Sequence, residues 1–145
     1  MRTTFQQLAR TSLAALAIAC SALSAQAALP DNLIAQGDQK WAQGELDAAQ
    51  TAFEEAVKAQ PRSVPAHMKL AGLQLYRQDF RACIETYQRT IGLDAKNAKA
   101  WLGLGFAYLH TGKNDLSLAA FNEAIRADPA NKDKLAPVLA KLGTK

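Results

Sequence analysis

An uninterrupted and largely apolar stretch runs from Trp101 to Leu109, nine residues without a charge whose only polar side-chain groups are the Trp101 indole N–H and the Tyr108 hydroxyl. A membrane span needs about twenty such residues, and a half-buried strand would alternate apolar with polar positions. Trp101, Leu104 and Tyr108 instead recur at the spacing of one helical face. The pattern therefore predicts a buried α-helix, and Gly112 is expected to break it.

A second apolar face follows this helix. Leu118, Phe121 and Ala124 fall on one side of a helix. Asn114 is a suitable N-cap for it, and Pro129 should end it, because the residue before a proline is pushed out of the helical region. Together the two segments predict a helical hairpin.

The same pattern recurs every 34 residues, in three blocks that span 30–63, 64–97 and 98–131. When the blocks are aligned, some columns hold only small residues and others only large ones. One small column contains Gly37, Ala71 and Gly105, and one large column contains Phe53, Tyr87 and Phe121. Antiparallel helices pack closely where small side chains let the backbones approach and large ones fill the gaps. The repeat therefore predicts an all-α fold of stacked hairpins.

The third block resembles the tetratricopeptide repeat, a motif with the same period. The resemblance is carried by Trp101, Leu104, Gly105, Tyr108, Phe121, Ala124 and Pro129. The block departs from the family signature at Asn114 and Ser117, and the first two blocks match it less completely. The resemblance implies three helix-turn-helix repeats that stack into a right-handed α-solenoid.

Residues 132–145 follow the last repeat, and their leucines and one valine recur at helical spacing. An end repeat exposes an apolar flank, so a terminal helix with a polar outer face is expected there as a cap. Pro137 costs little in the first turn of such a helix and about 3 kcal/mol or more deeper in it.

The first helix of each repeat is also apolar on a side that its own hairpin does not use. In the tetratricopeptide family that side lines a concave groove for peptides and partner helices, so the resemblance implies a partner groove here. Its lining is expected to consist of Ile34, Asp38, Trp41, Met68, Leu75, Tyr76, Leu102, Phe106, Leu109 and His110. For Trp41, Leu75 and Leu109, packing between neighbouring first helices is an equally good interpretation.

A mostly apolar lining favours a hydrophobic peptide or an amphipathic helix as the ligand. Family members that hold the free carboxylate of chaperone tails use lysine, arginine and asparagine on these helix faces. The matching positions here carry Ile34, Asp38 and Gly103, so that ligand class is excluded. The sequence predicts a non-catalytic scaffold or adaptor whose partner is a protein or a peptide.

Residues 1–27 have the features of a secretory signal peptide. Arg2 and Arg10 precede an apolar run, and Ala25 and Ala27 form a small-x-small cleavage site. We therefore expect export, to the bacterial periplasm. The alternative is lipidation of Cys20, which would make the protein a lipid-anchored assembly factor of the bacterial envelope; a membrane location is expected only in that case.

Removal of residues 1–27 lowers the formal net charge from +4 to +2, because two arginines leave with them. With this charge and no arginine-rich stripe, nucleic acid is a poor partner. The three blocks carry −3, +2 and 0, and the tail carries +3. Opposite charge at the two ends allows head-to-tail self-association, although solvated outer faces are the simpler interpretation.

The sequence offers no convergent catalytic groups. His67 and His110 fall on different faces of different repeats, and no paired-cysteine or phosphate-binding motif occurs. Cys83 lies in a column of small residues, which favours a buried structural thiol over a nucleophile. We therefore expect no metal, no cofactor and no enzymatic activity.

Overall fold

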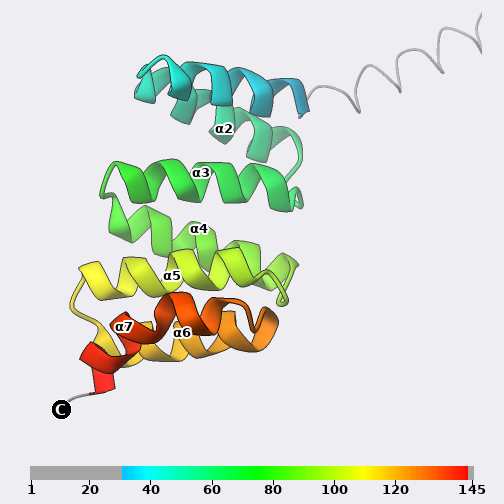
Figure 1. Cartoon of the computed structure of the whole chain (residues 1–145). Coiled ribbons are helices and arrows are strands. Elements are labelled where there is room, and N and C mark those ends of the chain that lie inside the picture. The colour runs from blue at the N-terminus through cyan, green and yellow to red at the C-terminus, as the bar shows by residue number, and fades with distance from the viewer. Residues whose placement is uncertain (1–30, 144–145) are drawn as a thin grey trace, which may run out of the picture.

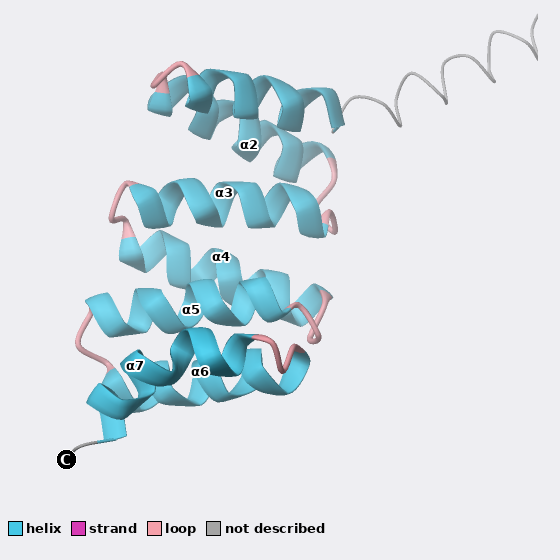
Figure 2. Cartoon of the chain, in the orientation of Figure 1, coloured by secondary structure: helices cyan, strands magenta, loops and turns pink. Residues whose placement is uncertain are grey.

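The computed structural model describes residues 31–143. The expected signal peptide, including Cys20, and residues 144–145 lie outside the described part of the chain. Within residues 31–143 helices alternate with short loops, and no strand occurs there (Figure 2).

The first helix covers residues 31–42 of the described chain. The helices after it are α2 (Leu46–Ala59), α3 (Val64–Tyr76), α4 (Phe80–Leu93), α5 (Ala98–His110), α6 (Asn114–Ala127) and α7 (Asn131–Gly143). The expectation of an all-α fold is confirmed, and each of the blocks 30–63, 64–97 and 98–131 holds one helical hairpin.

The hairpins stack on one another in two layers (Figure 1). The first helix, α3 and α5 form the layer nearer the viewer, and α2, α4 and α6 form the layer behind it. Between the second and third hairpins, α4 contacts both α3 and α5, and α3 also contacts α5. Each hairpin therefore buries one flank against the next, as the stacking of repeats requires.

The turn inside each hairpin depends on one residue with a left-handed backbone. Gly44, Gln78 and Gly112 occupy the same place in the three repeats, with φ values of 79°, 63° and 71°. Glycine adopts this region without a steric penalty, whereas a residue with a Cβ is strained there. The second turn therefore carries a strain that the other two avoid.

Side chains cap three of the helices at their N-termini. Ser63, Asp79 and Asn97 each accept a hydrogen bond from the backbone N–H three residues later, at 3.1–3.3 Å. The prediction that Asn114 caps the last repeat helix is wrong. Asn114 is the first residue of α6, and Lys113 occupies the cap position without a side-chain hydrogen bond.

Large aromatic rings fill the space that the small residues leave. Phe53 and Phe121 are fully buried, each against the glycine of its own hairpin, Gly37 and Gly105. Tyr87 instead lies against Gly103 of the next repeat, where any Cβ would collide with its ring. Aromatic packing against glycine thus holds helices together both within hairpins and between them.

α7 packs on α6 and buries Leu135. Pro137 lies inside this helix, beyond its first turn, which is the more costly of the two placements considered for it. No helix among residues 31–143 has both the length and the apolar character that a bilayer span requires.

Candidate functional site

The residues predicted to line the groove lie on the first helix, α3 and α5, and we call this set the groove face. Tyr76 and His110 are exposed, Tyr76 at 64%. The other eight are half-buried: Ile34, Asp38, Trp41, Met68, Leu75, Leu102, Phe106 and Leu109. The groove face is therefore partly open to solvent on all three of its helices, the first helix, α3 and α5.

Several of these side chains have a second role in packing. Trp41 contacts the core cluster shared by the first and second hairpins, and Met68 and Leu75 contact the cluster shared by the second and third. Phe106 meets Phe121 in an edge-to-face arrangement, with ring centroids 5.0 Å apart. The expectation that Phe106 is surplus to its own hairpin is therefore wrong, since its ring contacts the fully buried Phe121 of the same hairpin.

An ion pair lies on the groove face between two repeats. Lys69 Nζ donates to the two carboxylate oxygens of Asp38, at 2.8 and 2.7 Å, and joins α3 to the first helix. Sequence analysis did not place Lys69 on this face, because the matching residues of the other repeats, Ala35 and Gly103, carry no charge. Both side chains are 42% exposed, so solvent screens the pair and it adds little stability.

A cavity of about 330 Å³ opens where α3 and α5 end. Its lining, which we call the aromatic pocket, consists of Leu75, Tyr76, Gln78, Phe80, Phe106 and His110. The rings of Phe80 and His110 stack face to face, with centroids 5.0 Å apart and planes 10° apart. Sequence analysis missed Gln78 and Phe80, because they lie on the turn and on the second helix of the repeat rather than on the first.

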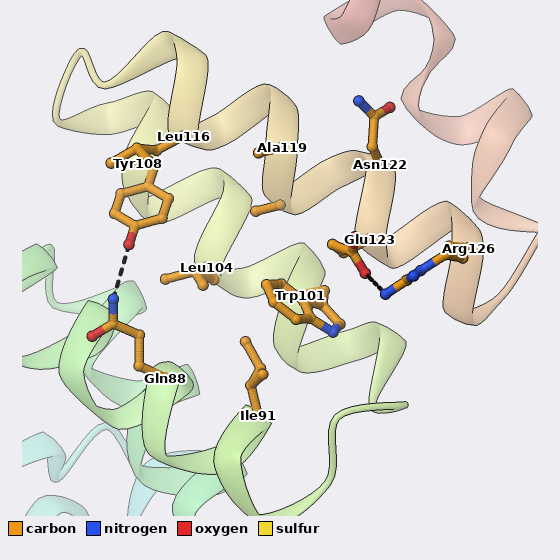
Figure 3. A pocket seen from close by; sticks show the side chains of 11 residues that line it. Gln88, Ile91, Trp101, Leu104, Tyr108, Leu116, Ala119, Asn122, Glu123 and Arg126 are labelled. Atoms are coloured by element: carbon orange, nitrogen blue, oxygen red, sulfur yellow. Dashed lines mark hydrogen bonds and ion pairs between the residues drawn. The ribbon is translucent and has the colours of Figure 1, made fainter.

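A larger cavity of about 750 Å³ lies over a different side of α5, between α4 and α6, and we call it the α4–α6 cavity (Figure 3). Trp101, Leu104 and Tyr108 extend from α5 into it, and Ile91 and Leu116 line it from α4 and α6. Its ends are polar. Gln88 Nε2 donates to the Tyr108 hydroxyl at 3.0 Å, and Glu123 and Arg126 form an ion pair at the other end.

The matching cavity one repeat earlier is smaller and more polar. It measures about 210 Å³ and lies beside His67, Gln74 and Thr86. There Thr86 Oγ1 donates to Gln74 Oε1 at 2.8 Å, so two polar side chains satisfy each other across the hairpin. The α4–α6 cavity has Tyr108 and Ala120 at these two positions, and its polar groups lie at its ends.

The titratable groups of the described chain do not converge on a catalytic arrangement. Cys83 is buried, and loss of hydration together with the nearby Asp79 carboxylate raises the pKa of its thiol to about 12. His67 is also buried, and its Nε2 lies 2.9 Å from the Pro61 carbonyl. Within residues 31–143 no group of three metal-ligating side chains is close enough to hold an ion.

The family model that matches this chain is that of the tetratricopeptide repeat, over residues 34–75 and 68–132. The general transcriptional corepressor ssn6 of Schizosaccharomyces pombe is 30% identical over 102 residues. That alignment covers 65% of this chain but 9% of the corepressor, so this chain corresponds to a small part of that relative.

Two solved structures are similar in fold. One is the first TPR of Spaghetti (RPAP3) bound to the HSP90 peptide SRMEEVD, with a TM-score of 0.74 and 18% identity over 79% of this chain and 90% of that one. The other is the TPR domain of Arabidopsis OM64, with a TM-score of 0.73 and 20% identity over 79% and 93%. At this identity the likeness concerns the fold.

Proposed function

The chain belongs to the tetratricopeptide repeat family, and on that premise we propose that it is a non-catalytic scaffold or adaptor that binds a partner protein. Tetratricopeptide repeats mediate protein–protein interactions and are not themselves enzymes. The ligand we propose is a hydrophobic peptide or an amphipathic helix of the partner, held on the groove face.

The observation that carries this proposal is the incomplete burial of the groove face. Ile34 on the first helix, Met68 on α3 and Leu102 on α5 are half-buried, and Tyr76 at the end of α3 is 64% exposed. Partly exposed apolar side chains gathered on one face are typical of an interaction site. An amphipathic helix that covered it would remove these side chains from water at a gain of about 25 cal/mol per Å² of apolar area.

The charges on the groove face favour a ligand other than an acidic peptide tail. The HSP90 peptide in the Spaghetti (RPAP3) structure, SRMEEVD, is acidic at its C-terminal end. Lys69, which we place on the face, is already paired with Asp38. An incoming carboxylate would compete with Asp38 for that cation, whereas an apolar helix face would not.

The proposed site of action is outside the cytoplasm, in the bacterial periplasm, after cleavage following Ala27. The features of residues 1–27 support this address. A lipid-anchored assembly factor attached through Cys20 is the alternative proposal. The intact mass of the exported protein decides between them, since a chain that starts at Ala28 supports the first and a diacyl adduct on Cys20 supports the second.

The test of the groove face compares two leucines that lie on different surfaces. Peptides are first selected on the wild-type protein from a phage-displayed library of random sequences. Leu102→Glu should weaken the selected peptides at least about tenfold, because a carboxylate buried under an apolar ligand has no partner. Leu116→Glu, in the α4–α6 cavity, should leave their affinity unchanged.

Circular dichroism and melting of both variants show whether the fold is intact. Retained helicity with lost peptide binding in Leu102→Glu alone supports the groove face. If Leu116→Glu removes binding and Leu102→Glu does not, the partner site is the α4–α6 cavity and the proposal is wrong.

A further inference from the structure

The same position on the groove face is filled at the first junction between repeats and open at the second. At the first junction Trp41 covers Gly72, so that an alanine at 72 would place its Cβ 3.7 Å from the indole ring. The indole also lies against Tyr76, with ring centroids 5.9 Å apart. Here the chain fills the position with its own tryptophan.

At the second junction the corresponding residues leave that place open. Leu75 stands 34 residues after Trp41, and Phe106 stands 34 residues after Gly72. The shorter Leu75 side chain does not reach across as an indole does, and Phe106 is drawn toward Phe121, 5.0 Å away between ring centroids. The result is the aromatic pocket of about 330 Å³.

We propose that the aromatic pocket receives one large neutral aromatic side chain of the partner, a tryptophan. This inference rests on the proposed function, since it places the anchor residue of the bound peptide or helix at the end of the groove face. The partner's indole at the second junction would lie where the indole of Trp41 lies at the first.

The size of the pocket supports a single side chain as its occupant. The cavity of about 330 Å³ lies at the lower end of the range of about 300–1,000 Å³ found for small-molecule sites. It can therefore hold one large side chain but not a whole helix. Tyr76, 64% exposed, forms part of the wall and would be covered by the occupant. Tryptophan, tyrosine and arginine are the residues that most often dominate binding energy at interfaces, and the first two are uncharged.

The charge of the pocket supports a neutral occupant. None of its six lining residues is an aspartate, glutamate, lysine or arginine. A charged side chain would lose hydration there without gaining a counter-ion. An indole needs only one acceptor for its N–H, and the Gln78 carboxamide and the Tyr76 hydroxyl on the pocket wall both offer an acceptor oxygen.

The experiment uses the isolated side chain as the probe, so that it does not depend on knowing the partner. N-acetyl-tryptophanamide is titrated into labelled protein and followed by NMR. We expect saturable shifts centred on Tyr76, Phe106 and His110, with N-acetyl-leucinamide binding about tenfold more weakly because it lacks ring contacts. N-acetyl-lysinamide should give no shifts at these residues.

Two alanine variants serve as a matched pair. Tyr76→Ala removes an exposed wall of the aromatic pocket and should reduce the affinity for N-acetyl-tryptophanamide at least about threefold. Leu116→Ala removes an apolar side chain that is also exposed, at 49%, but lies in the α4–α6 cavity. It should leave the shifts unchanged.

A third variant fills the pocket from within. The double substitution Leu75→Trp and Phe106→Gly copies the Trp41 and Gly72 pair into the second junction and should abolish the shifts. If this variant fails to fold, the comparison of Tyr76→Ala with Leu116→Ala still decides the question.

The outcomes separate this inference from the proposed function. The inference is overturned if N-acetyl-tryptophanamide gives no shifts, if its shifts map outside the pocket, or if N-acetyl-lysinamide binds as well. In each of these cases Leu102-dependent binding of the selected peptides still supports the groove face. Conversely, shifts at Tyr76 without Leu102-dependent peptide binding uphold the pocket and reject the wider groove.

Discussion

The first and third repeats have the same hairpin interior but different outer flanks. Phe53 and Phe121 occupy the same repeat position, and both are fully buried. On the flank that faces the preceding repeat, the third repeat carries Leu104 at 4% exposure, whereas the first carries the exposed Gln36 at the same position. A repeat position is therefore buried by its own hairpin or by its neighbour, and between these two repeats only the first kind is alike.

The neighbour explains the difference at this flank. In the third repeat, α4 lies over α5, and Ile91 of α4 packs against the cluster that contains Leu104 and Tyr108. In the first repeat, Gln36 and Lys40 take the places of Leu104 and Tyr108. A polar leading flank of this kind is what a terminal repeat needs for solubility, and it gives the first repeat little apolar surface on which a second copy could stack.

The largest expected effect concerns the position that the two repeats share. Phe53→Ala and Phe121→Ala should each lower the free energy of unfolding by about 3–5 kcal/mol, because each ring is buried within its own hairpin. Urea denaturation measures both, with Trp41 reporting on the first repeat and Trp101 on the third. Near-wild-type stability of either variant would contradict the packing described for that hairpin.

A substitution at the flank position, Leu104 or Gln36, should change the stability of the two repeats by different amounts. Leu104→Ala should cost about 2–5 kcal/mol, because Leu104 is buried against the neighbouring repeat. Gln36→Ala, at the same position of the first repeat, should change stability by less than about 0.5 kcal/mol. Equal costs in the same urea experiment would show that the flank of the first repeat is covered as well.

α7, which packs on α6, gives a way to strengthen the end of the stack that holds the third repeat. Pro137 lies in the helix interior and its side chain is exposed, so Pro137→Ala restores a backbone donor without loss of packing. We expect a gain of about 1–3 kcal/mol, seen through Trp101 fluorescence. Pro129→Ala, in the loop before α7, is the control and should change stability by less than about 0.5 kcal/mol.

The smallest expected effect concerns the hairpin turns. Gln78→Gly should raise the free energy of unfolding by about 0.5–1 kcal/mol, because glycine relieves the strain of the positive φ. Gly112→Gln makes the reverse change in the third repeat and should lower it by a similar amount. Thermal melts measure both variants. If both melting temperatures rise, or both fall, relative to the wild type, backbone strain is ruled out as the cause.

Much of the fold could be predicted because its information is local. The period of 34 residues, the small and large columns and Pro129 place each hairpin within a few residues of where it lies. The cap of α6 was misplaced by one position, since Asn114 and Lys113 both precede the apolar face and only the backbone geometry separates them. The left-handed Gln78 was missed because glycine marks such a turn and glutamine does not.

The candidate site could be predicted in outline only. The helical period assigns Leu102 and Phe106 to one side of α5, but it does not reveal that Phe106 leans on Phe121 or that Lys69 reaches Asp38. The aromatic pocket depends on Phe80 and Gln78, which come from a turn and a second helix. No repeat column contains this combination.

The sequence by itself determined which residues are helical, where each hairpin turns and which side of each helix is apolar. These properties follow from backbone propensity and periodicity, which act over a few residues. Only the tertiary structure decided which apolar side chains remain in contact with solvent. Exposure depends on the neighbour that lies across each junction. Trp41 and Gly72 fill the first junction, whereas Leu75 and Phe106 leave the second one open.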